Sequence, residues 1–143
     1  MYASFSVRSK GSSLNINKVM SRISTFYRPT DSLLSVVDSL ADKHHSCGLI
    51  CDGGIPVGII TERDIVRLTA KINHGELKSD CLIGEVMTEH PISINADTPL
   101  SDALAMANER NLRHFPVLDP AGTVIGVVTQ FQGTNQIQPR LVS

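Results

Sequence analysis

The sequence predicts a mixed α/β fold (α+β) made of two copies of a β-α-β-β-α repeat. The first observation is internal similarity: V-M-[ST] occurs at residues 19–21 and 86–88, and G-h-h-T, where h is apolar, occurs at residues 58–61 and 126–129. The second is a set of apolar residues at helical spacing in each copy. The third is a pair of continuous apolar runs joined by a turn. Such self-similarity indicates one structural unit used twice.

The two pairs of motifs are offset by 67 and 68 residues, so one residue is gained between them. The gain falls where Asp-Gly-Gly at residues 52–54 corresponds to Asp-Pro-Ala-Gly at residues 119–122. Turns tolerate insertions, so the slip supports a repeat. We expect a flexible lead at residues 1–14, the first repeat at 15–78, the second at 79–132 and a tail at 133–143.

Each copy is expected to begin with a short strand and a helix. The strands are predicted at residues 25–27 and 92–94, and Asp31 or Ser32 is placed to cap the first helix. The apolar faces of the two helices consist of Leu33, Val36, Val37, Leu40 and Ala41 in the first copy and Leu100, Ala103, Leu104 and Ala107 in the second.

A buried hairpin follows each of these helices. Its strands are predicted at residues 48–51 and 56–60 in the first copy, and at residues 115–118 and 124–128 in the second. The glycine-rich turn of the first hairpin supplies positive φ at low cost. Runs that are continuously apolar indicate strands covered on both faces.

A second helix is expected after each hairpin. Thr61 can cap the first of these, whose apolar residues are Ile65, Val66, Leu68 and Ile72. In the second copy the helix barely begins at residues 130–132, and the chain turns polar beyond Gly133. There we expect disorder or a connection to another segment.

Composition excludes several classes of protein. Hydrophobic residues make up 41% and charged residues 19%, which is typical of a globular chain, and no apolar run reaches the roughly 18–20 residues of a membrane span.

The first 30 residues carry five bases and no acid, so the remainder has eight bases against 14 acids, which argues against nucleic acid as a partner. The basic, serine-containing start fits either a transit peptide or a flexible lead. Three cysteines without a signal sequence indicate a reducing, cytoplasmic location.

These motifs resemble a pair of cystathionine-β-synthase-type (CBS) domains, the Bateman module. The resemblance covers roughly residues 15–132 and is strongest at V-G-I-I-T-E-R-D-I-V-R-L (57–68) and R-H-F-P-V-L-D (113–119). It implies two repeats about a pseudo-twofold axis, with an adenine nucleotide or related adenosyl ligand in the clefts between them. AMP, ADP, ATP and S-adenosylmethionine are the expected regulatory ligands, and no cofactor is required. It also implies a homodimer and an attached or partner enzyme, channel or transporter.

The first copy carries the stronger candidate site. Gly58 permits close approach to its strand, and Thr61 with the free N–H groups at the helix start can face an anion. In the family the aspartate of G-h-h-T-x-x-D binds the ribose hydroxyls, and Asp64 occupies that place. Arg63 can neutralise a phosphate. The alternative is that Thr61 only caps the helix and that the charged residues after it form a solvated first turn.

The second copy departs from this pattern. Thr129 is kept, but Gln132 stands where the aspartate is expected, so we predict one competent ribose site and a second that is weak, altered or empty. By resemblance, R-H-F-P lies near the base and phosphate. Arg113 and His114 are candidate phosphate contacts or an ordinary exposed basic pair. Ile92, Phe115 and Pro116 complete the candidate set, with Ile92 and Pro116 better interpreted as core or cleft wall.

No motif supports catalysis or metal binding. His44, His45, Cys47 and Cys51 resemble a metal cluster only superficially, because two residues four apart on a strand are separated by about 13 Å at roughly 3.3 Å per residue. No P-loop, dinucleotide fingerprint or catalytic triad spacing is present. We therefore expect a regulatory, nucleotide-sensing module that is not an enzyme. The alternatives are a dimerisation scaffold with vestigial sites and a fragment of a larger signalling enzyme.

Overall fold

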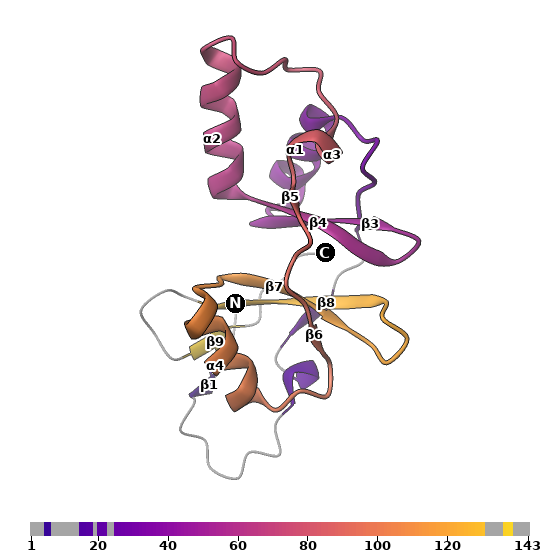
Figure 1. Ribbon diagram of the computed structural model, residues 1–143, viewed down its shortest axis with the longest axis vertical. Coiled ribbons are helices and arrows are strands. Elements are labelled where there is room, and N and C mark those ends of the chain that lie inside the picture. Colours follow the sequence, from indigo (N-terminus) through magenta and orange to yellow (C-terminus); the bar gives the residue numbers. More distant parts are fainter. Residues whose placement is uncertain (1–4, 7–14, 19, 23–24, 131–135, 139–143) are drawn as a thin grey trace. The chain divides into compact units, whose positions relative to one another are not determined.

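The computed structural model describes residues 5–6, 15–18, 20–22, 25–130 and 136–138 (Figure 1). The chain forms two compact units, and each is described by itself. One unit is Ser24–Pro91. The other combines the described residues of Met1–Ile23 with those of Ile92–Leu141. The units therefore do not follow one another simply along the chain.

The unit Ser24–Pro91 holds a three-stranded sheet with helices on one side (Figure 1). Its strands run in the order β3-β4-β5, and both pairings are antiparallel. A single parallel bridge joins Tyr27 to Ile50. The elements are α1 (Leu33–Lys43), β3 (Cys47–Asp52), β4 (Ile55–Thr61), α2 (Glu62–Asn73), α3 (Ile83–Val86) and β5 (Thr88–Glu89).

Local chemistry explains where α1 begins and ends. The Ser32 hydroxyl accepts a hydrogen bond from the Ser35 N–H, and His44 closes the helix in the left-handed conformation. The apolar face of α1 packs on the strands, and the core of this unit includes Leu33, Val36, Leu40, Ile50 and Ile60. Ile50 and Ile60 are completely buried. The helix, its cap and the hairpin are thus confirmed as predicted.

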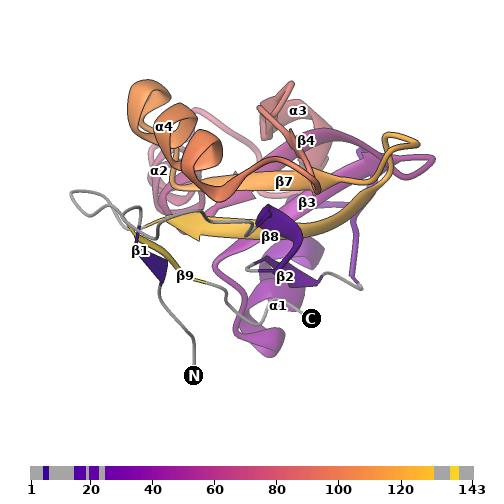
Figure 2. The same ribbon diagram turned by 90° about the horizontal axis from the view of Figure 1, so that it is seen from below.

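The other unit is built on a six-stranded sheet. Five strands follow the order β1-β9-β8-β7-β6, and β2 pairs with β8 off this path. Figure 2 shows α4 alongside β7, and the apolar face of α4 packs with Phe115 and Val117. The elements are β1 (Phe5–Ser6), the 3-10 helix η1 (Ile16–Lys18), β2 (Ser21–Arg22), β6 (Ile94–Asn95), α4 (Leu100–Arg110), β7 (His114–Leu118), β8 (Val124–Gln130) and β9 (Gln136–Gln138).

The two hairpins are completed in the same register by exchanged segments. Ser21 pairs with Val127, whereas Thr88 pairs with Ile59. Each V-M-[ST] segment therefore adds a strand to the hairpin of the other copy. A Cβ on Gly58 would overlap the Met87 side chain. A Cβ on Gly126 would lie 2.7 Å from the Met20 sulfur and 2.6 Å from the Ser21 carbonyl oxygen.

Three expectations about the ends of elements are wrong. The first strand of the first copy is reduced to the Tyr27 bridge. Gln130, predicted to start a helix, lies in β8, while residues 131–132 lie outside the described residues. Residues 136–138, expected to be disordered or to connect to another segment, form β9, and β1 within the predicted flexible lead pairs with it. The backbone groups at the end of β8 are satisfied by β9, a pairing that local sequence patterns do not reveal.

The two glycines give a matched test of the exchanged segments. Gly126→Ala should lower the free energy of unfolding by about 1–3 kcal/mol, because its Cβ meets a backbone oxygen that cannot rotate away. Gly58→Ala should cost less, since only the flexible Met87 side chain must move, and Met87→Ala should restore part of the loss. Urea denaturation measures all three. Equal losses at both glycines, or no rescue by Met87→Ala, would contradict this packing.

Candidate functional site

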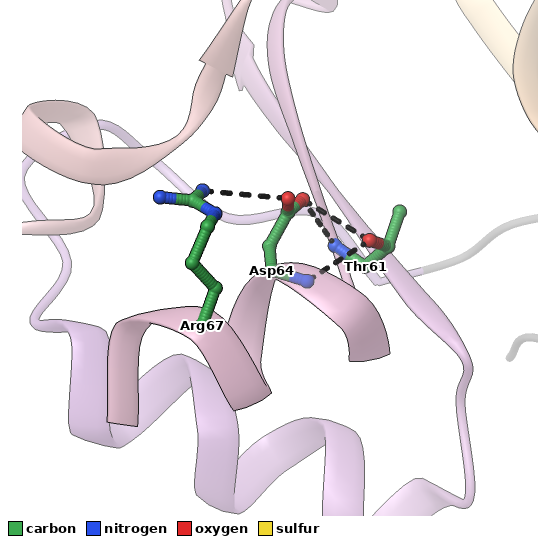
Figure 3. Close-up of polar contacts among 3 residues, drawn as sticks. All are labelled: Thr61, Asp64 and Arg67. Carbon is green, nitrogen blue, oxygen red and sulfur yellow. Dashed lines mark hydrogen bonds and ion pairs between the residues drawn. The ribbon is translucent and has the colours of Figure 1, made fainter. Parts of the chain in front are cut away.

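Thr61 and Asp64 form a reciprocal capping box at the start of α2. The Asp64 N–H donates to the Thr61 Oγ1 at 3.3 Å, and the Thr61 N–H donates to Asp64 Oδ2 at 2.9 Å. The Thr61 hydroxyl also lies 3.1 Å from Oδ2. Figure 3 shows these contacts. The cap that the sequence offered as an alternative to a ligand site is therefore present in full, and it fixes the carboxylate in one orientation.

The carboxylate is not part of a fully solvated turn, as that alternative supposed. The Asp64 side chain is only 17% exposed, whereas Glu62 and Arg63 are exposed. Its second oxygen, Oδ1, lies 3.5 Å from Nη2 of Arg67, whose side chain is 49% exposed (Figure 3). Arg67 was not predicted from the sequence. The signal was the three-residue spacing between Asp64 and Arg67, which places both side chains on one helix face.

The glycine in front of this motif has a structural partner. Gly58 was predicted to permit a close approach to its strand, and the structure places the side chain of Met87 there. Gly58 is buried in β4 and pairs with Glu89 of β5. The close approach is real, but it accommodates a methionine of the same unit.

The corresponding point of the second copy has a different structure. Thr129 faces His114 across the β7–β8 pair and Gln138 across the β8–β9 pair. Thr129 is 3% exposed, and its hydroxyl has no hydrogen-bond partner among the described residues. The strand continues to Gln130, where the first copy turns into α2. Gln132 lies outside the described residues.

The other predicted contacts of the second copy differ in accessibility. Arg113 is exposed just before β7, and His114 is partly buried at its first position. Phe115 is completely buried in the core of its unit, and Pro116 is also buried. Ile92 precedes β6 and is partly buried. Phe115 is thus a core residue, as its place in the predicted buried hairpin indicated, rather than an accessible contact.

Each unit also has a cavity at the turn end of its hairpin. One, of about 410 Å³, is lined by Arg28, Pro29, Thr30, Cys51, Asp52 and Gly53. The other, of about 420 Å³, is lined by the corresponding residues Asn95, Ala96, Asp97 and Pro120. Thr61 lies at the far end of β4 from Gly53. The first cavity is therefore separate from the capping box.

The cysteines and histidines of the first copy do not assemble a metal site. Within the described part of the chain, no three His, Cys, Asp or Glu side chains are grouped to hold an ion. Cys47, Cys51 and Cys81 are free and buried. Burial raises the pKa of Cys47 to about 12 and that of Cys51 to about 11, so both thiols are protonated at neutral pH. They act as small apolar side chains.

His45 is an unexpected buried polar residue. It is 7% exposed, and its Nε2 has no hydrogen-bond partner among the described residues. Burial lowers the pKa of His45, and the nearby charges of Lys43 and His44 lower it further. The corresponding residue of the second copy is Leu112, which packs against the core of its own unit.

The fold and its repeated motifs define a tandem-repeat α+β protein. A family model for the CBS domain matches residues 16–71 and 83–131, and the chain therefore belongs to the CBS domain family. Among the described residues, no helix is long and apolar enough to cross a membrane.

Curated and solved relatives support this assignment. The CBS domain-containing protein CBSCBSPB1 of Arabidopsis thaliana is 34% identical over 100 residues, which are 70% of this chain and only 18% of that protein. The CBS domain pair of protein MJ0100, solved with 5'-methylthioadenosine and S-adenosyl-L-methionine, is 25% identical with a TM-score of 0.69, over 81% of this chain and 89% of that one. Protein PAE2072 of Pyrobaculum aerophilum, solved with AMP, is 22% identical with a TM-score of 0.71, over 81% and 87%.

Replacing His45 should change how stability depends on pH. Because burial lowers the folded-state pKa of His45, the unfolded chain takes up the proton first as pH falls, and stability is lost below the ordinary histidine pKa of about 6.5. His45→Leu, which copies Leu112, should remove this loss. Urea denaturation of both proteins between about pH 7.5 and pH 5 measures it. If the free energies of unfolding of the wild type and of His45→Leu differed by the same amount throughout this range, the lowered pKa of His45 would be contradicted.

Proposed function

We propose that the chain is a regulatory module that senses an adenine nucleotide or a related adenosyl ligand through the turn Thr61–Asp64. The observation that carries this proposal is the fixed, partly exposed carboxylate of Asp64 in a chain of the CBS family. The MJ0100 domain pair, solved with two adenosyl compounds, supports this class of ligand. AMP, ADP, ATP and S-adenosylmethionine are the candidates.

The carboxylate can serve the cap and a ligand together. Oδ2 is used by Thr61, while Oδ1 has, among the described residues, only the long contact with Arg67. A carboxylate offers about four acceptor positions, and Thr61 and Arg67 engage three of them. One ribose hydroxyl can therefore donate to Oδ1 directly, and a second can do so in place of the long contact with Arg67. Its orientation is already set by the capping box, which reduces the entropy lost on binding.

We propose one such site in each chain. The second copy has Gln132 in place of the aspartate, and Thr129 is buried in a strand that continues past it. Arg113, His114, Pro116 and Ile92 remain candidate contacts of a ligand. The loss of the carboxylate in the second copy is the observation behind a second candidate function, a dimerisation scaffold with vestigial sites.

Regulation would follow from differential binding. A ligand that binds one conformation of the module more tightly shifts the conformational equilibrium toward it. Only this difference in affinity can change the activity of an attached or partner enzyme or transporter. We assign the module no reaction of its own. The chain spans only 18% of the length of its plant relative. The existence of a regulated enzyme or transporter is therefore part of the proposal. Three free cysteines support a reducing, cytoplasmic setting.

We also propose a homodimer formed through α1 and α2. Leu34 on α1 is 49% exposed and Val66 on α2 is 71% exposed. In a two-fold symmetric contact the same patch is used by both partners. Sedimentation at tens of micromolar should therefore give a dimer, and Leu34→Asp combined with Val66→Asp should give a monomer that still unfolds cooperatively, at a melting temperature lowered by the loss of the partner. A wild-type monomer at that order of concentration would contradict the proposal.

Asp64→Asn tests the ligand site. Affinity for AMP or S-adenosylmethionine should fall about ten- to a hundredfold, because charge-assisted hydrogen bonds contribute roughly 1.5–3 kcal/mol. The weakened capping box should also lower stability by about 0.5–2 kcal/mol.

Ser32→Ala is the matched control, because Ser32 caps α1 in the same unit and has no contact with Asp64. It should lower stability by a similar amount and leave affinity unchanged. Calorimetric titration and urea denaturation separate the two effects. Wild-type protein that binds none of the candidate ligands would favour the scaffold.

A further inference from the structure

We infer that Arg67 makes this site selective for an adenosyl ligand that carries phosphate on its ribose, over a neutral or sulfonium compound. The inference rests on the proposed function, in which Asp64 holds the ribose. Arg67 was not among the residues predicted from the sequence, and its charge narrows the class of ligand.

The geometry places Arg67 beside the carboxylate that is proposed to hold the ribose. Its Nη2 lies 3.5 Å from Asp64 Oδ1, on the same face of α2 (Figure 3). A guanidinium has five N–H donors, and this contact engages one group. Because the pair is long and the arginine is 49% exposed, the remaining donors can turn to a bound anion at little cost.

Charge gives the contact its selectivity. The negative charge of Asp64 repels a phosphate on the ribose that it binds, and a cation held against the same carboxylate cancels that repulsion. The guanidinium also matches phosphate geometry and can bind it in a bidentate manner. A sulfonium is itself positive, so Arg67 opposes it.

Arg63 is the rival for this role. It is exposed, and no ion pair joins it to another described residue. It directly precedes Asp64, and adjacent residues of a helix do not face each other. Arg67 is thus better placed than Arg63 to contact a phosphate next to Asp64.

The two copies differ at both positions together. With the offset of 68 residues, Asp64 corresponds to Gln132, a neutral amide, and the second repeat ends there, before any counterpart of Arg67. The second copy thus lacks the carboxylate and the cation at once.

The test is calorimetric titration of the full chain with AMP, adenosine and S-adenosylmethionine. Arg67→Gln should weaken AMP binding about ten- to a hundredfold and change adenosine binding by less than about threefold. It should not weaken S-adenosylmethionine binding. Arg63→Gln is the matched control and should change AMP binding by less than about threefold. Equal melting temperatures confirm that both variants are folded.

The outcomes separate this inference from the function on which it rests. Unchanged AMP affinity in Arg67→Gln, an equal loss of AMP and adenosine, or the larger loss in Arg63→Gln would each overturn the role of Arg67 while leaving a nucleotide site in place. Wild-type protein that binds neither AMP nor adenosine would remove the proposed site and this inference together.

Discussion

Both units depend on the close approach of a methionine side chain to a glycine within a strand. Met87 lies against Gly58 and Met20 against Gly126, where any side chain would collide with the incoming segment. In each case the methionine comes from the V-M-[ST] segment that begins the other copy, and the next residue starts a strand that pairs with the hairpin. Each unit therefore contains residues from both copies, and a cut between the copies would remove part of each unit's core.

The proposed function depends on the residues just after the threonine of G-h-h-T. In the first copy the Asp64 carboxylate accepts from Thr61, and this reciprocal cap turns the chain into α2. In the second copy the strand continues, β9 occupies its edge, and the Thr129 hydroxyl is left buried without a partner among the described residues. The repeated motif thus presents a fixed carboxylate in the first copy, and the proposed ligand site rests on that difference.

Local patterns predicted most of the fold. Helical spacing located α1 and α4, the turn residues located both hairpins, and Thr61 was placed correctly as the cap of α2. The exchange of segments and the β9 pairing were not predicted, because they join residues far apart in the sequence. At the site, motif spacing singled out Thr61, Arg63 and Asp64 but not Arg67. The three-residue spacing between Asp64 and Arg67 was available in the sequence, but only the structure shows the contact between their side chains.

Backbone amide NMR during an AMP titration tests the central claim, that the first copy alone carries the nucleotide site. The amides of Thr61, Asp64 and Arg67 should shift and saturate at one equivalent of AMP, while those of His114 and Thr129 shift much less. Shifts centred on Thr129 and His114, with the turn at Thr61 unaffected, would contradict the claim.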